Sequence, residues 1–193
     1  NEMLQASDNS QTRETAATMG KHISRMENYV SSMSNIRRME DTQPEYKLID
    51  LQPLVSSLYD SAKIVCTKNG KELILQNDIP ILQLSLDSAF ISQVCNNLIS
   101  NAVRYARTLV TISFALHDNG LLLSVSDDGN GFDKDSLQKA ANPYFTGESN
   151  HSEHFGLGLY ICKLLCEHHN GYLKIRNTVN GANVSAYFKS STL

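Results

Sequence analysis

Two asparagines four residues apart, Asn97 and Asn101, share one face of a predicted helix with Arg104 and Tyr105. The opposite face is apolar and carries Val94, Leu98 and Ala102. Asparagine competes with the backbone for hydrogen bonds and is disfavoured inside helices, so two on one stripe need an explanation. Amide oxygens are hard, neutral ligands that can join phosphate oxygens and waters around an octahedral Mg²⁺ ion. The stripe therefore predicts a ligand-binding face, although a single asparagine would more simply cap or satisfy a neighbouring loop.

A second candidate group lies at the end of a predicted strand, in the sequence Asp127-Asp128-Gly129-Asn130-Gly131. An aspartate held at a strand end can accept a hydrogen bond from an exocyclic amine such as that of adenine. The alternative is a plain tight turn, because glycine and aspartate dominate turns. We expect Asp128 to be solvated rather than functional.

A third group starts a predicted helix, in the sequence Gly156-Leu157-Gly158-Leu159. Glycines at a helix N-terminus let backbone N–H groups approach an anion, which the helix dipole also favours. The alternative is an ordinary junction between a loop and a helix. Together the three groups offer candidate hosts for a metal ion, an adenine and phosphates.

The elements that must position these residues have the pattern of a compact α/β domain. The expected elements are a strand at 46–51, a helix from about Pro53 to Asn69, a pair of strands at 71–78 and 80–87, the asparagine helix at 93–106, a hairpin at 109–129 that turns at 118–120, a weak helix at 134–141, a helix from 156 and a final hairpin at 171–189 that turns at 180–181. In this order the three candidate groups fall at helix and strand ends.

The interval from Asn130 to His154 is long and polar, and a loop of this length usually means a lid or a disordered segment. Its composition offers little apolar area to offset the entropy of ordering. Its main apolar residues are Pro143, Tyr144 and Phe145. We expect a mobile lid coupled to ligand binding; the alternative is that the aromatic pair packs permanently and the remainder is disordered.

The first 45 residues have a different pattern, with apolar residues at alternating steps of three and four. These residues are Ala16, Met19, Ile23, Met26, Val30 and Met33. Such a narrow seam predicts a long helix that packs against a partner helix, either in a homodimer or in an intramolecular bundle. We therefore expect two parts, residues 1–45 and 46–193.

The composition limits the classes of partner and the compartment. A net charge of −3 argues against nucleic-acid binding by phosphate neutralisation. The cysteines Cys66, Cys95, Cys162 and Cys166 lie in apolar helical patterns, which favours buried, reduced thiols and a cytosolic location. No apolar run approaches the roughly 20 residues that span a bilayer, and the N-terminus does not resemble a signal peptide. We expect no membrane contact by this sequence, even if it belongs to a membrane-bound sensor.

Four segments in order resemble the conserved boxes of the sensor histidine kinases. "QVCNNLISNAVRYA", "DDGNG", "NPYFTG" and "FGLGLYICKLL" are similar to the N, G1, F and G2 boxes at their usual spacings. The resemblance covers roughly Leu48 to the C-terminus, and "SLDSAFISQVCNNL" resembles the family's approach to the N box. It implies the Bergerat ATP-binding fold, a two-layer α/β sandwich in which helices cover one face of a mixed sheet and nucleotide lies between helices and a lid.

The resemblance assigns roles to individual residues. It implies that Asn101 binds Mg²⁺ with Asn97 beside it, and that Arg104 reaches the phosphates of ATP. Tyr105 and Leu159 would line the pocket, with ordinary packing as the alternative for both. Asp127 would accept from the adenine amine, and a further set would border the nucleotide: Gly129, Gly131, Thr146, Gly156, Leu157 and Gly158. Thr146 departs from the Arg or Lys of many relatives, and a solvated pair is the simpler interpretation of His151 and His154.

The family's phosphoacceptor motif, His followed by an acidic residue and then by basic, Ser/Thr and Pro positions, does not occur in the sequence. The seam helix resembles the second helix of the dimerisation hairpin, so we expect the acceptor histidine upstream of Asn1. His22 has no acidic residue at the next position and is not expected to serve. The implied partners are a second copy of the chain, the chain's own phosphoacceptor helix and a response regulator.

The same fold serves hydrolytic ATPases, in which a Glu four residues before the metal-binding asparagine activates water. Here that position is Asn97, and an amide cannot act as a general base. The resemblance therefore favours a histidine kinase, with catalysis by positioning and charge neutralisation. The alternatives are a nucleotide-binding regulatory module, and an ATPase or serine kinase of the same fold.

Overall fold

The computed structural model describes residues 39–80, 82–145 and 156–191, together with residues 15, 18–20 and 23. The chain divides into two compact units, residues 1–40 and 41–193. In the first unit the described residues 15, 18–20 and 23 are helical and exposed, among them Met19 and Ile23 of the seam. The other seam residues and His22 lie outside the described residues, so the partner of the seam and the boundary after residue 45 stay predictions.

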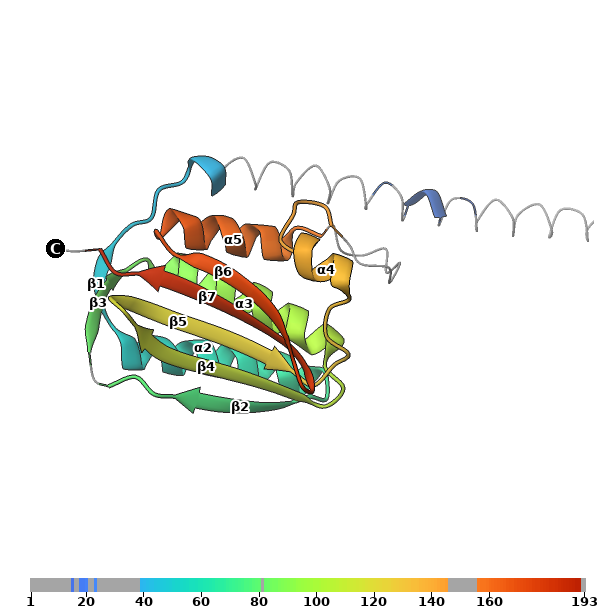
Figure 1. Cartoon of the computed structure of the whole chain (residues 1–193), viewed down its shortest axis with the longest axis horizontal. Coiled ribbons are helices and arrows are strands. Elements are labelled where there is room, and N and C mark those ends of the chain that lie inside the picture. Colours follow the sequence, from blue (N-terminus) through green and yellow to red (C-terminus); the bar gives the residue numbers. More distant parts are fainter. Residues whose placement is uncertain are drawn as a thin grey trace, which may run out of the picture. The chain divides into compact units, whose positions relative to one another are not determined.

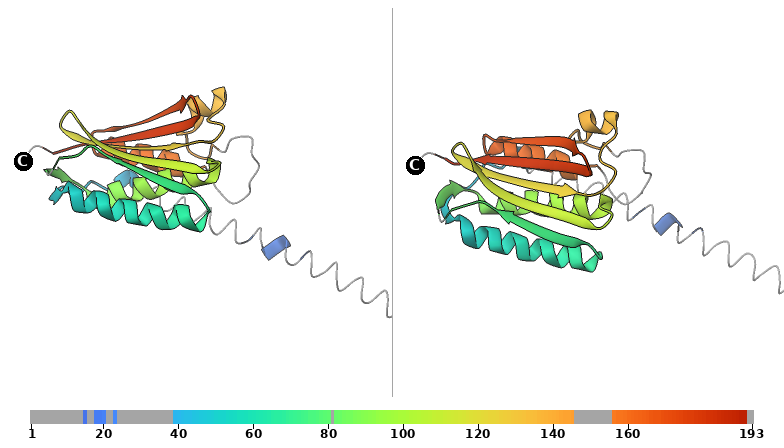
Figure 2. Two further views of the ribbon diagram at one scale, coloured as in Figure 1. Left: turned by 90° about the horizontal axis from the view of Figure 1, so that it is seen from below. Right: turned by 60° about the horizontal axis from the view of Figure 1, so that its bottom comes forward.

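The second unit is a two-layer α/β domain. Its strands are β1 (Lys47–Asp50), β2 (Glu72–Asn77), β3 (Gln83–Leu86), β4 (Leu109–His117), β5 (Gly120–Asp127), β6 (Tyr172–Thr178) and β7 (Gly181–Lys189). Its helices are α2 (Leu51–Lys68), α3 (Ser88–Tyr105), α4 (Lys134–Lys139) and α5 (Gly158–His168). Helices α2, α3 and α5 cover one face of the main sheet (Figure 1), and the turned views in Figure 2 show the short α4 apart from them, at the end of the sheet. The expected architecture is confirmed.

The main sheet has the strand order β2-β4-β5-β7-β6. Strand β2 is parallel to β4, and the other neighbours are antiparallel, so the sheet is mixed. The predicted turns at Asp118-Asn119 and before Gly181 are both present. Asp118 adopts the left-handed conformation, with φ 48°, that a two-residue hairpin turn requires.

The prediction that the strands at 71–78 and 80–87 pair with each other is wrong. Both strands form, but β3 pairs antiparallel with β1 in a separate two-stranded sheet, and β2 pairs with β4. The end of β2 is directed away from β3, because the N–H of Asp78 donates to the carbonyl of Phe114 on β4 at 3.1 Å. Helix α2 also starts two residues earlier than expected, which leaves Pro53 in the first turn, where its missing N–H costs nothing.

The core lies between the sheet and the three helices. On α3 the predicted apolar face is fully buried, with Val94, Leu98 and Ala102 at 0–4% exposure. Every second residue of β4, Val110, Ile112 and Phe114, faces this layer and is buried. All four cysteines are buried and free, as predicted. Among the described residues no helix is both long and apolar enough to cross a membrane.

The N-terminal end of α3 is held by a buried polar cluster formed by Asp87 and His169. The Asp87 carboxylate accepts from the N–H groups of Ala89 and Phe90 at 2.9 and 3.1 Å, and from Glu45 at 2.8 Å. The N–H of Asp87 donates to Nε2 of His169 at 3.0 Å. Helix α3, the segment before β1 and the end of α5 therefore meet at one point.

His169 is completely buried among aromatic rings, with Tyr46 edge-on at 4.8 Å between ring centres. Burial lowers the pKa of its imidazole, although its contacts with the Lys189 carbonyl and the Asp87 carboxylate oppose this. Because Nε2 accepts a hydrogen bond, the neutral ring with its proton on Nδ1 is the form that fits this site. A second proton on Nε2 would break the bond from Asp87.

We expect His169 to make the domain less stable in mild acid. Its pKa is lower in the folded than in the unfolded chain, so its contribution to stability is complete above the unfolded pKa of about 6.5 and is lost as the pH falls below it. His169→Gln keeps an acceptor but cannot titrate. Thermal unfolding between pH 7.5 and 5.0 should show a shallower fall for this variant than for the wild-type chain.

His117→Gln is the matched control, because the His117 side chain is half exposed and lies on β4, far along the chain from the Asp87 cluster. It should follow the wild-type pH profile. Identical pH profiles for wild type and His169→Gln would contradict the role given to His169.

Candidate functional site

The polar stripe of α3 lies where the sequence predicts. Asn97 and Asn101 are partly buried, whereas Arg104 and Tyr105 are exposed at the end of the helix. The guanidinium carbon of Arg104 lies 5.8 Å from the centre of the Tyr105 ring. The stripe thus presents two amides, one cation and one aromatic ring on the face that α3 does not bury in the core.

Asn97 has a polar atom that the described part of the protein does not satisfy. Its Nδ2 is buried without a hydrogen-bond partner among the described residues. The side chain lies beside the Cys162 thiol of α5, where it lowers the pKa of that thiol, but burial dominates and raises the pKa to about 12. A thiol sulfur is a weak acceptor and does not replace a true partner. An unpaired buried amide is rare enough in proteins to indicate a missing ligand or water.

The donor set also limits which metal the site could hold. Among the described residues no group of three His, Cys, Asp or Glu side chains could hold a metal ion. What the stripe offers is amide oxygen, a hard and neutral ligand. Such a set fits Mg²⁺ that shares its coordination with phosphates and water, and does not fit zinc.

Asp127 ends β5 on the side of the sheet that faces the helices. Burial raises the pKa of its carboxyl group, and N–H groups of Gly129 and Ala182 oppose the effect. The Gly129 N–H donates to Oδ1 at 2.9 Å. A partly desolvated carboxylate in this position is well suited to accept from a ligand amine.

The loop after Asp127 packs tightly against the protein itself. A Cβ on Gly129 would lie 2.3 Å from the carbonyl oxygen of Tyr105, and one on Gly181 would lie 2.0 Å from that of Asp127. Gly131 has a φ of 75°, which favours glycine. These glycines are thus required for contact with α3 and with the β6–β7 hairpin, whatever ligand binds beside them.

Asp128 is partly exposed, and its carboxylate also accepts hydrogen bonds from the protein. Its carboxylate accepts from the N–H of Arg107 at 2.8 Å and from the N–H and hydroxyl of Thr108 at 3.0 and 2.7 Å. Although burial acts to raise its pKa, these hydrogen bonds outweigh that effect and lower the pKa below its usual range. Asp128 therefore ties the G1-like loop to the chain that follows α3.

Lys71 holds the same turn from another direction. Its ammonium group donates to the carbonyls of Ala106 and Arg107, both at 2.8 Å. These carbonyls follow the last turn of α3, where the helix dipole favours a cation. The sequence pattern did not single out Lys71, because nothing local to "NGKEL" shows that a distant helix ends beside it.

The start of α5 is open at one residue and closed at its neighbours. No described residue lies within 4 Å of a Cβ added to Gly158, whereas a Cβ on Gly156, which has a φ of 65°, would lie 2.2 Å from the carbonyl oxygen of Phe145. Leu157 is buried, and Leu159 is partly buried against the core. Within the described part of the chain, the helix N-terminus at Gly158 is accessible to an anion.

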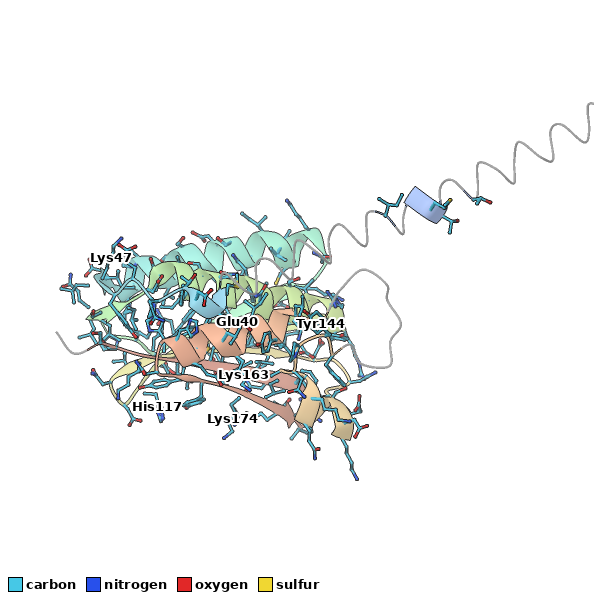
Figure 3. The ribbon with its side chains drawn as sticks, turned by 90° about the horizontal axis from the view of Figure 1, so that it is seen from above. Glu40, Lys47, His117, Tyr144, Lys163 and Lys174 are labelled. Carbon is cyan, nitrogen blue, oxygen red and sulfur yellow. The ribbon has the colours of Figure 1, made fainter. Side chains whose placement is uncertain are left out.

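The candidate groups come together at one end of the domain. Figure 1 shows that the ends of α3 and β5, the start of α5 and the turn between β6 and β7 lie at this end. Tyr144, which has a strained φ of 64°, lies at this end as well, whereas Lys47 lies at the other end of the domain (Figure 3). Thr146, His151 and His154 lie outside the described residues, so their expected roles and the lid stay predictions.

Comparison with known proteins gives consistent results. A family model described as "Histidine kinase-, DNA gyrase B-, and HSP90-like ATPase" matches residues 86–192, more than half of the chain. The chain is 26% identical over 198 residues to the sensor histidine kinase YvrG of Bacillus subtilis, which covers 97% of this chain and 34% of YvrG. It is 30% identical over 164 residues to the sensor protein kinase PilS of Pseudomonas aeruginosa, which covers 81% of this chain and 30% of PilS.

The chain thus spans about a third of the length of these curated relatives. Among solved structures, the catalytic domain of the histidine kinase ThkA aligns with a TM-score of 0.66 at 23% identity, over 76% of this chain and 96% of that domain. This likeness shows the fold of the second unit.

Two substitutions should distinguish a glycine that close packing requires from one that it does not. Gly129→Ala places a methyl group on the Tyr105 carbonyl, so we expect the free energy of unfolding to fall by about 1–3 kcal/mol, the usual cost of overpacking. Gly158→Ala meets open space and should change it by less than about 0.5 kcal/mol. Urea unfolding of both variants measures the difference, and equal effects would contradict the close approach at Gly129.

Proposed function

Since the chain belongs to the histidine kinase-, DNA gyrase B- and HSP90-like ATPase family and corresponds to the ATP-binding region of its sensor kinase relatives, we propose that it binds Mg²⁺-ATP and presents the γ-phosphoryl group to a histidine. The observation that carries this proposal is the Nδ2 of Asn97, which is buried without a hydrogen-bond partner among the described residues. It belongs to α3, whose end lies beside the end of β5 and the start of α5 (Figure 1). Metal, base and phosphate sites are thus available together.

In this proposal each residue of the stripe has a distinct task. Asn101 and Asn97 hold Mg²⁺ through their amide oxygens, and the bound ion neutralises phosphate charge. The buried Nδ2 of Asn97 donates to a phosphate oxygen, a partner that the described residues do not supply. Arg104 adds an exposed cation at the end of the stripe, and Tyr105 supplies a ring beside it. Thr146 joins from the segment that leads back to α5.

At the other side of the site, Asp127 accepts from the adenine amine. Its raised pKa reflects a carboxylate that is partly desolvated, and a donor from the ligand offsets that cost. Gly156, Leu157, Gly158 and Leu159 form the start of α5, where backbone N–H groups approach the phosphates. Gly129 and Gly131 shape the loop that carries Asp127.

The amide side chain of Asn97 favours phosphoryl transfer over hydrolysis. An amide cannot take a proton from water, so the γ-phosphoryl group is kept for a better nucleophile. An imidazole from a dimerisation helix is such a nucleophile, and the catalytic contribution of this domain is then positioning and charge neutralisation. A regulatory module that only binds nucleotide would share the site but would not transfer phosphate to an added acceptor.

The partners in this proposal follow the sequence pattern of the first unit. The seam helix of residues 1–45 supports a homodimer, and the phosphoacceptor helix packs with it. A response regulator then takes the phosphoryl group in the cytoplasm. The apolar spacing of the seam supports this arrangement, as do the histidine kinase relatives.

We expect the chain to bind Mg²⁺-ATP, and Asn101→Ala to weaken binding by about tenfold or more, because a ligand to the metal is lost. Titration calorimetry with and without Mg²⁺ measures both effects. Asn96→Ala is the matched control, since Asn96 is exposed on the same helix. An Asn101 variant with unchanged dependence on Mg²⁺ would remove Asn101 from the metal site.

The same chain should not label itself from γ-labelled ATP, because the phosphoacceptor motif does not occur in its sequence. Adding a dimerisation hairpin with an acceptor histidine should give acid-labile, base-stable label on the hairpin. Label on the chain alone would direct attention first to His22. Release of inorganic phosphate without label on the hairpin would instead favour an ATPase.

Asp127 should determine the preference for adenine over guanine. The carboxylate accepts from the adenine amine, whereas guanine presents a carbonyl at that position and is repelled. Asp127→Asn should therefore bind ATP about 10- to 100-fold more weakly, as expected for a hydrogen bond to a charged group, and should discriminate less against GTP. The exposed Asp60 provides the control variant Asp60→Asn. An unchanged ratio of ATP to GTP affinity in Asp127→Asn would rule out this role.

A further inference from the structure

Asn177 on β6 holds the loop that carries Asp127. Its Nδ2 donates to the carbonyl of Phe132 at 2.7 Å, and its Oδ1 accepts from the N–H of the same residue at 2.8 Å. One side-chain amide thus pairs with both polar groups of one backbone residue, as a neighbouring strand would. The two residues are 45 positions apart in the sequence, so only the tertiary fold brings them together.

The loop is shaped around this side chain. A Cβ on Gly131 would lie 2.7 Å from the Asn177 Oδ1, and Gly131 has a φ of 75°. Any other residue at this position would force the loop away from Asn177. The small residue and the positive φ at Gly131 thus leave the space in which the Asn177 side chain reaches the loop.

The same hairpin also contacts the beginning of the loop. In the β6–β7 register Asn177 lies opposite Ala182, and the Ala182 N–H forms a hydrogen bond to the Asp127 carboxyl group. Two paired residues of one hairpin thus hold the two ends of the loop, Ala182 at Asp127 and Asn177 at Phe132. The distance between these ends is fixed by the strand pairing.

The other side of the loop is tied to the chain after α3. Asp128 accepts from Arg107 and Thr108, and the Arg107 guanidinium donates to the Asn130 side chain at 2.6 Å. The loop is thus attached on both sides, and the Asp127 carboxylate is also held directly by the N–H groups of Gly129 and Ala182. Removing one attachment leaves Asp127 in the protein but loosens the loop that carries Gly129.

We propose that Asn177 is a positioning residue for Asp127: by holding Phe132 it fixes the direction of the carboxylate and so determines the preference of the site for an adenine base. This inference rests on the proposed function. Asn177 touches no ligand in this role and acts only through the loop. It is therefore a determinant of base specificity that lies outside the four boxes.

The test is to replace Asn177 and measure the affinities for ATP, GTP and inorganic tripolyphosphate with Mg²⁺. Asn177→Ala removes both hydrogen bonds, and the isosteric Asn177→Asp removes the donor to the Phe132 carbonyl. Each should weaken ATP binding by about fivefold to tenfold and lower the ratio of ATP to GTP affinity. Binding of tripolyphosphate, which has no base, should not change. Val179→Ala is the control, because Val179 is fully exposed in the same hairpin.

A double variant shows whether Asn177 acts through Asp127. In the Asp127→Asn background, Asn177→Ala should not lower the ATP to GTP ratio further, since the group that it positions is gone. A ratio that is unchanged by both Asn177 variants would overturn the inference, as would an equal loss of all three ligands, which indicates a general loss of structure. A wild-type chain that binds no ATP would instead contradict the proposed function.

Discussion

Helix α3 has to be fixed in rotation and in position along its axis, because it carries the core on one face and the polar stripe on the other. At its first turn the Asp87 carboxylate accepts two N–H groups of the helix and one from Glu45. Beyond its last turn the Lys71 ammonium holds two carbonyls, and Asp128 takes the N–H groups of Arg107 and Thr108. Asp87 at the first turn and Lys71 beyond the last turn carry the charges that the helix dipole favours at each end.

Close backbone contact is the second constraint, and it explains why glycines gather at this end of the domain. The β5 loop crosses the end of α3 at Gly129, and the β6–β7 turn packs on Asp127 at Gly181. A side chain at either position would push the elements apart. Gly158 differs, since a Cβ added to it would meet no described residue within 4 Å. Glycines that look alike in sequence thus serve either packing or access, and only the neighbouring backbone distinguishes them.

The two adjacent aspartates show how environment divides similar groups. Burial raises the pKa of Asp127, whereas hydrogen bonds from Arg107 and Thr108 lower that of Asp128 despite some burial. The carboxylate oxygens of Asp128 accept hydrogen bonds from the protein and thereby hold the loop. Asp127 receives fewer donors and remains partly desolvated, the state in which a new donor gains most. The Nδ2 of Asn97, which no described residue pairs, is also buried and would gain from a new hydrogen-bond partner.

The sequence by itself determined what repeats locally. The helical period of 3.6 residues predicted that Val94, Leu98 and Ala102 are buried and that the polar stripe lies on the other face. Turn residues predicted the positions of both hairpins. The resemblance of four ordered segments to the boxes of the sensor histidine kinases predicted the fold, which is confirmed, and the site residues, whose roles stay predictions. Tertiary structure decided which segments meet: the partners of β2 and β3, the burial of His169, and the contacts of Lys71, Asp128 and Asn177. These depend on residues tens of positions apart, and no local period or turn signal carries that information, since hydrogen bonds between distant segments exist only after the sheet and its helices have packed.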